Sequence, residues 1–96
     1  MTEQKIQTKI IDYLRSVGAY VVKVVKASKA GVPDLIACYN GRFIAIEVKK
    51  EGGRVSSIQE YNLEKIIEAQ GLAIIAYRVE DVKSVIKYLE NGYENL

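Results

Sequence analysis

The sequence contains no histidine and no tryptophan, and only one cysteine and one proline occur among its 96 residues. Without histidine, a Ser-His-Asp or Cys-His nucleophile system is excluded, and so is a zinc site of the usual Cys/His kind. The single cysteine, Cys38, excludes an internal disulfide. No apolar run approaches the roughly 18 residues that a membrane-spanning helix needs. If the protein binds a metal, its ligands are therefore oxygen atoms, which favour Mg²⁺ or Mn²⁺.

The composition is that of a globular chain, with 49% hydrophobic and 27% charged residues. A length of 96 residues predicts one domain. The first residues carry charges without a following apolar block, so we expect no signal peptide. The net charge of +2 does not by itself indicate nucleic-acid binding. Basic residues nevertheless gather at positions 23–29 and 49–54, where the alternative to a binding role is a solvated surface.

Hydrophobic periodicity predicts an α/β fold in which helices and strands share one chain. Three helices are expected, at residues 2–17, at 57–70 and from 80 to about 92. Four strands are expected, at residues 19–25, 34–39, 42–49 and 72–77. The two middle strands are apolar almost throughout, which is typical of strands covered on both faces. We therefore expect Cys38 to be a buried thiol.

The dipeptide Asn40-Gly41 between two apolar runs predicts a β-hairpin with a two-residue type I′ turn. This turn sets a register in which Asp34 lies opposite Glu47, and Lys49 points to the same face. Two opposed carboxylates on inner strands destabilise the sheet unless one is protonated or a cation lies between them. The alternative is a structural network of ion pairs with Lys49.

Two further polar residues fall on helix stripes that should face the sheet. Glu3 precedes Ile6 on the stripe of the first helix, although an acid in a first turn is also explained by the helix dipole. Gln59 precedes Leu63 on the second helix, which the capping box Ser57-Ile58-Gln59-Glu60 is expected to open. If both helices pack on the face of the opposed carboxylates, these side chains converge on one candidate active site.

The segment Pro33-Asp34, followed after twelve residues by Glu47-Val48-Lys49, resembles the PD-(D/E)XK motif of restriction-endonuclease-like nucleases. Glu3 on the first helix, the segment 31–36 and Ser57-Ile58-Gln59 resemble the VRR-NUC family of that superfamily more closely. The resemblance covers about residues 3–82. It implies a mixed central sheet flanked by helices, a single nuclease domain over residues 1–96, and phosphodiester hydrolysis dependent on Mg²⁺ or Mn²⁺.

The resemblance also implies roles for individual residues. The metal would be bound through oxygen atoms, those of Asp34 and Glu47, the backbone carbonyl of Val48, and Glu3 as a supporting or second-metal ligand. Lys49 would orient or activate the attacking water and stabilise charge in the transition state. Gln59 would position Lys49 or the phosphate. None of these roles requires histidine.

The resemblance further implies a cytoplasmic endonuclease, of a bacterium or a phage-infected host, that acts on branched DNA such as Holliday junctions without contacting a membrane. Phosphate contacts are expected from the residues around the cleft, Lys23, Lys26, Ser28, Lys29, Lys50 and Arg54. Because one chain has one such site, paired cuts need a homodimer, formed through the last helix or the strand at 72–77. Two other activities remain open: a DNA-binding module that does not cleave, and a monomeric nickase or single-strand nuclease.

Overall fold

The computed structural model describes residues 1–92 of the chain. The helices in this range are α1 (Glu3–Ser16), α2 (Ser57–Glu68) and α3 (Val79–Lys87), and a short π-helical segment, η1 (Tyr88–Gly92), follows α3. The strands are β1 (Tyr20–Lys23), β2 (Leu35–Tyr39), β3 (Arg42–Val48) and β4 (Leu72–Ala76). The predicted order of elements is confirmed, and most predicted ends lie within two residues of these bounds. The end of the last helix is the exception, because α3 ends at Lys87 and η1 continues to Gly92.

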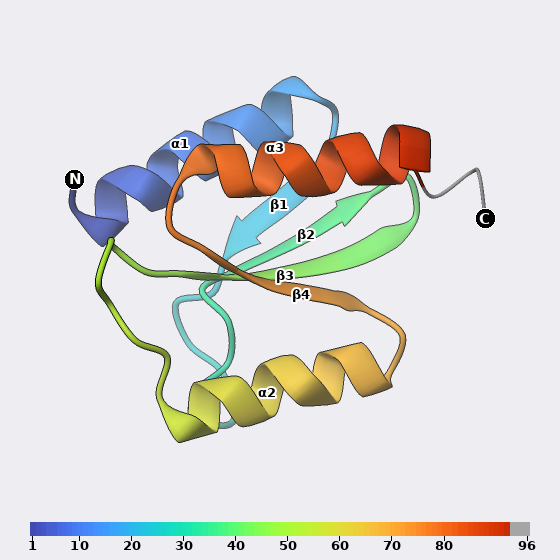
Figure 1. The fold of residues 1–96 in the computed structure, drawn as a ribbon. Helices are drawn as coiled ribbons and strands as arrows, with labels where there is room; N and C mark the ends of the chain where they lie inside the picture. The colour runs from blue at the N-terminus through green and yellow to red at the C-terminus, as the bar shows by residue number, and fades with distance from the viewer. Residues whose placement is uncertain (93–96) are drawn as a thin grey trace.

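The four strands form one mixed sheet in the order β1-β2-β3-β4. The pairs β1–β2 and β2–β3 are antiparallel, whereas β4 runs parallel to β3 after the crossover through α2. Helices α1 and α3 lie together on one face of this sheet, and α2 lies on the other (Figure 1). The predicted α/β fold with a mixed sheet flanked by helices is therefore confirmed.

The main hydrophobic core lies between the sheet and the pair of helices α1 and α3. Alternate residues of β2 and β3 point into it, because successive side chains of a strand face opposite ways. The largest side chains in this layer are almost inaccessible to solvent and come from both helices and both strands: Ile10, Leu14, Leu35, Ile44, Ile46, Val48, Val82 and Ile86. None of the helices within residues 1–92 combines the length and apolar character that a membrane span requires.

The hairpin between β2 and β3 has the predicted turn and the predicted register. Asn40 and Gly41 both have positive φ angles, 49° and 78°, as a type I′ turn requires. The strands pair from Tyr39 opposite Arg42 to Leu35 opposite Ile46. Asp34 lies one residue before β2, so continuing this register places it beside Glu47.

The expectation that both faces of β2 are covered is wrong. Cys38 is exposed rather than buried, and Ile36 is only half-buried. The reason is that α2 packs against β3 and β4 and does not extend over β1 and β2. The α2 face of the sheet is therefore open at its hairpin end, where Tyr20 is 71% exposed and Phe43 is 44% exposed.

Replacing Gly41 by alanine is expected to lower the free energy of unfolding by about 1–2 kcal/mol, the cost of a left-handed conformation for an L-residue. No atom lies within 4 Å of a Cβ at this position, so the loss comes from the backbone alone. Urea denaturation measures it, with Asn40→Gly as the matched control that keeps the positive φ angle accessible and stays nearly neutral. Equal effects of the two substitutions would contradict this explanation of the turn.

Candidate active site

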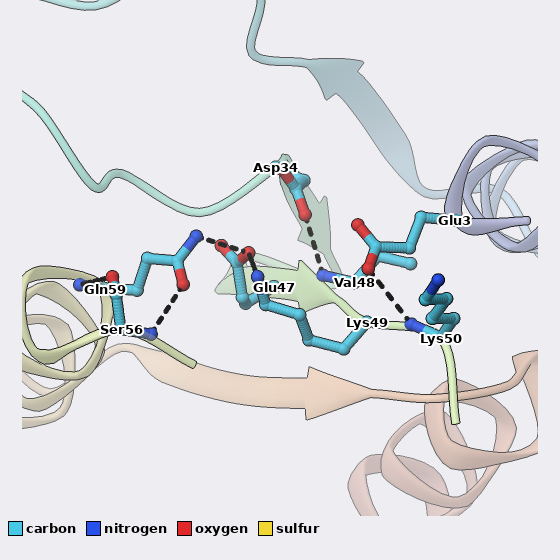
Figure 2. A network of polar contacts seen from close by, with 8 residues as sticks. All are labelled: Glu3, Asp34, Glu47, Val48, Lys49, Lys50, Ser56 and Gln59. Atoms are coloured by element: carbon cyan, nitrogen blue, oxygen red, sulfur yellow. Dashed lines mark hydrogen bonds and ion pairs between the residues drawn. The ribbon is translucent and has the colours of Figure 1, made fainter. Parts of the chain in front are cut away.

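The site is built around Glu47, a carboxylate on the α2 face of β3 that is only 2% exposed. Two groups contact its Oε2 atom (Figure 2). The Nε2 atom of Gln59 donates a hydrogen bond to it at 3.0 Å, and the Nζ atom of Lys49 forms an ion pair with it at 3.6 Å. These three side chains therefore lie together, as predicted.

The N-terminus of α2 orients the Gln59 side chain. Ser56 is the N-cap, its hydroxyl accepts a hydrogen bond from the backbone N–H of Gln59, and its own N–H donates to Gln59 Oε1 at 2.9 Å. Because this capping box uses the amide oxygen, the amide nitrogen faces Glu47. The predicted box starting at Ser57 is wrong by one residue, although the spacing Ser56-x-x-Gln59 was visible in the sequence.

Asp34 is fixed beside this cluster through its backbone and its side chain. Its Oδ2 atom accepts a hydrogen bond from the backbone N–H of Val48 at 2.8 Å, and its carbonyl accepts one from Val24 at 2.8 Å. The carbonyl of Val48 was expected at the site, whereas the contact from its N–H group to Asp34 was not. Two carboxylates from adjacent segments of the hairpin thus lie together at one end of the sheet.

The burial of Glu47 next to a second carboxylate raises its pKa. Burial, and secondly the nearby charge of Asp34, raise the pKa of Glu47 from 4.5 to about 7, while Lys49 acts in the opposite direction. One ammonium therefore does not offset the two carboxylates. Oxygen donors with a deficit of positive charge match the ligand preference of Mg²⁺ and Mn²⁺.

Glu3 approaches the site differently from the expectation. Its helix, α1, packs on the opposite face of the sheet from α2, so the condition that both helices pack on the face of the opposed carboxylates is not met (Figure 1). Glu3 instead reaches the end of β3, where its Oε2 atom accepts a hydrogen bond from the backbone N–H of Lys50 at 3.3 Å (Figure 2). Within residues 1–92, no three acidic, histidine or cysteine side chains are arranged as a metal-binding group.

The residues expected to contact DNA are all exposed. Lys23 is the last residue of β1, Lys26, Ser28 and Lys29 lie in the segment that follows it, and Lys50 and Arg54 lie in the segment between β3 and α2. The first of these segments is attached to α2 by Asn62, which is 4% exposed and donates to the carbonyls of Ala30 at 3.1 Å and Ile58 at 2.9 Å. Sequence analysis missed Asn62, whose position beside Leu63 on the buried stripe was the available signal.

The raised pKa of Glu47 predicts how stability depends on pH in metal-free buffer. Between pH 4.5 and about 7 the folded protein binds the Glu47 proton more tightly than the unfolded chain does. The free energy of unfolding should therefore fall by about 3 kcal/mol as the pH rises through this window, relative to Glu47→Gln. Urea denaturation of both proteins in EDTA measures the difference, and parallel pH profiles would contradict it.

Comparison with known proteins identifies the fold. A solved VRR_NUC domain superposes with a TM-score of 0.79 at 20% identity, covering 90% of this chain and 95% of that one. A second VRR_NUC domain protein gives a TM-score of 0.74 at 25% identity, covering 91% and 86%. The Holliday junction resolvase Hjc of Archaeoglobus fulgidus gives 0.62 at 20% identity, covering 78% and 67%. The predicted resemblance to VRR-NUC proteins is confirmed.

Sequence comparison agrees with the structural similarity. A putative nuclease, p44, of Acyrthosiphon pisum secondary endosymbiont phage 1 is 28% identical over 85 residues, which cover 88% of this chain and 90% of that protein. Residues 4–92 match the family described as archaeal Holliday junction resolvase (Hjc). Since this match spans nearly the whole chain, the protein belongs to the Hjc family of nucleases.

Proposed function

We propose that the protein is a metal-dependent endonuclease that hydrolyses phosphodiester bonds in DNA. The observation that carries the proposal is the contact set of Glu47, a buried carboxylate that shares its surroundings with Asp34 and is contacted by Lys49 and Gln59. A purely structural sheet gains nothing from burying a carboxylate next to a second one, because the desolvation cost exceeds what one ion pair returns. A site that uses both carboxylates explains why they are there.

The residues that would hold the ion are Asp34, Glu47 and the backbone carbonyl of Val48. Glu3, from α1, contacts the backbone just after β3 and would be a supporting ligand. When bound, Mg²⁺ or Mn²⁺ polarises the phosphate and lowers the pKa of coordinated water. The hydrogen bond from Val48 N–H holds Asp34 in one orientation, and Gln59 holds Glu47 in the same way. Oriented ligands of this kind need no rearrangement when the ion binds.

Lys49 supplies the positive charge for the phosphate. Its side chain is 15% exposed, so the ammonium lies in a partly desolvated position next to Glu47. A cation placed there stabilises the negative charge that develops on the phosphoryl oxygens in the transition state. It would also orient the attacking water. Gln59, which contacts Glu47 and not the reacting atoms, acts as a positioning residue.

We further propose that the substrate is branched DNA, such as a Holliday junction, and that two chains act together. The exposed lysines of the segment after β1 and the basic residues after β3 are suited to phosphate contacts, which position a protein on DNA without reading bases. Coordinated cuts in two strands need two sites, hence a symmetric homodimer. Strand β4 supports this, because it is an edge strand of apolar sequence whose residues Leu72–Ile75 are only half-buried.

The proposal is tested by cleavage of labelled DNA. A four-way junction, a linear duplex and a supercoiled plasmid are each incubated with Mn²⁺, Mg²⁺ or EDTA. We expect metal-dependent cutting of the junction that falls by at least about 100-fold in Lys49→Ala, because one electrostatic group in a transition state contributes on this order. Lys9→Ala is the matched control, since Lys9 is an exposed lysine on α1.

Other outcomes of this assay would replace the proposal. Junction binding without cutting in either metal would identify a DNA-binding module. Cutting of one strand only, by a protein of monomeric mass, would identify a nickase or single-strand nuclease. Cutting that survives in Lys49→Ala would show that the proposed role of this residue is wrong.

Metal binding is expected to stabilise the fold as well. At a Mn²⁺ concentration about 100-fold above its dissociation constant, the added stability is about 2.7 kcal/mol. Thermal denaturation with increasing MnCl₂ should therefore show a rising midpoint for the native sequence. The rise should disappear in Asp34→Asn and in Glu47→Gln. A midpoint that does not depend on Mn²⁺ in the native sequence would contradict the proposed site.

A further inference from the structure

An open cavity of about 570 Å³ lies between α2 and the hairpin, on the same face of the sheet as the candidate active site. Its apolar lining includes Pro33, Ile36, Phe43 and Ile66, and the ring of Phe43 is 44% exposed. Pockets of this size that combine apolar surface with a few polar groups are typical of ligand sites. Of the residues assigned a role in catalysis or DNA contact above, Lys29 alone is among those that line this cavity.

Gly71 allows Phe43 to lie where it does. A Cβ atom at this position would be 3.0 Å from Phe43 Cδ1 and 2.9 Å from Ile66 Cγ2, so any other residue would displace the ring or the helix. The cavity remains open on its far side because α2 does not extend over β1 and β2. The exposed ring is therefore fixed at the edge of an open face.

The charges at the cavity have one sign. Lys29 and Lys65 are among its lining residues, and no Asp or Glu is among those that the structure describes. Glu68 pairs with Lys65 at 3.3 Å, but both side chains are largely exposed and Glu68 does not line the cavity. Because exposed pairs of this kind contribute little, the surface is complementary to an anion.

The cavity adjoins the candidate active site along two elements. Pro33 lines the cavity, and the next residue is Asp34. On α2, Asn62 lines the cavity one turn after Gln59. Phe43 and Glu47 lie on the same face of β3, four residues apart, so about 13 Å separates them along the strand. A ligand in the cavity would therefore lie within a few nucleotides of a phosphate at the site.

We propose that this cavity binds one unpaired nucleotide of the DNA substrate, with its base against Phe43 and its flanking phosphates on the surrounding cations. Aromatic side chains stack on bases of any sequence, and basic residues follow the backbone, as in other single-strand sites. A second copy of the chain is the competing occupant. It would have to cover Lys29 and Lys65 although no acidic residue lines the described part of the cavity, which is unfavourable. The inference rests on the proposed function and names the DNA feature recognised beside the same site.

The test measures binding in EDTA, so that it does not depend on cleavage. Phe43→Ala is compared with the native sequence on two DNAs of equal length, a fully paired duplex and a duplex with an unpaired tail. We expect affinity for the tailed DNA to fall at least about fivefold, with little change for the paired duplex. Tyr88→Ala is the matched control, because Tyr88 is 49% exposed and lies outside the cavity.

A second variant reports on the cavity directly. The chain has no tryptophan, so Phe43→Trp introduces a single fluorophore at this position. Tailed DNA should quench its emission more strongly than paired duplex does, and Lys29→Ala should weaken the quenching titration. Equal quenching by both DNAs would overturn the proposal.

The remaining outcomes separate the two hypotheses. Equal losses of affinity for both DNAs in Phe43→Ala would overturn the nucleotide site. The nucleotide site would also be overturned if Phe43→Ala lowered the molar mass measured by light scattering without changing the DNA preference. The cavity would then be a contact between two copies of the chain. If tailed DNA binds as expected but no DNA is cleaved in either metal, the nucleotide site stands and the proposed nuclease function fails.

Discussion

The charge of Glu47 is the constraint on which the rest of the site depends. A carboxylate that is 2% exposed beside Asp34 is unfavourable unless each of its lone pairs and its charge meet a partner. Lys49 approaches along the same strand, and Gln59 approaches from α2 with its amide turned by the N-cap of that helix. These partners offset only part of the cost of burying this charge next to Asp34, and the pKa of Glu47 is therefore still raised. A divalent cation bound by both carboxylates, as proposed above, would remove that cost.

One face of the sheet carries the hydrophobic core, and the other carries the candidate active site. On one face, α1 and α3 enclose nearly all of the large buried side chains, so this layer holds the strands in place. On the other face, α2 covers only β3 and β4, and this half-covered surface contains Glu47, Gln59 and the Phe43 cavity. A fully covered face would exclude a phosphate backbone. The incomplete cover by α2 is therefore what lets a small chain present a buried carboxylate next to an open surface.

Local sequence is enough to predict the hairpin and its register. It is not enough to predict how the helices pack on the sheet, because that depends on contacts between distant segments. Asn40-Gly41 fixes the hairpin turn, and the turn then fixes which residues of β2 and β3 are opposed. Helical periodicity shows which stripe of a helix is buried but not which face of a sheet this stripe packs against. The packing of α1 on the face opposite to α2, and with it the approach of Glu3, could therefore not be predicted. The exposure of Cys38 was missed for a related reason: a strand sequence does not reveal how far a neighbouring helix extends over it.

The central claim is that one divalent cation binds where Glu47 otherwise holds a proton. Calorimetric titration with Mn²⁺ in two buffers of different ionisation enthalpy measures how many protons each ion displaces. Because the pKa of Glu47 is raised to about 7, we expect nearly one proton released per ion at about pH 6 and almost none at about pH 8. In Glu47→Gln this release should vanish. Binding without proton release at about pH 6, or the absence of binding, would contradict the claim.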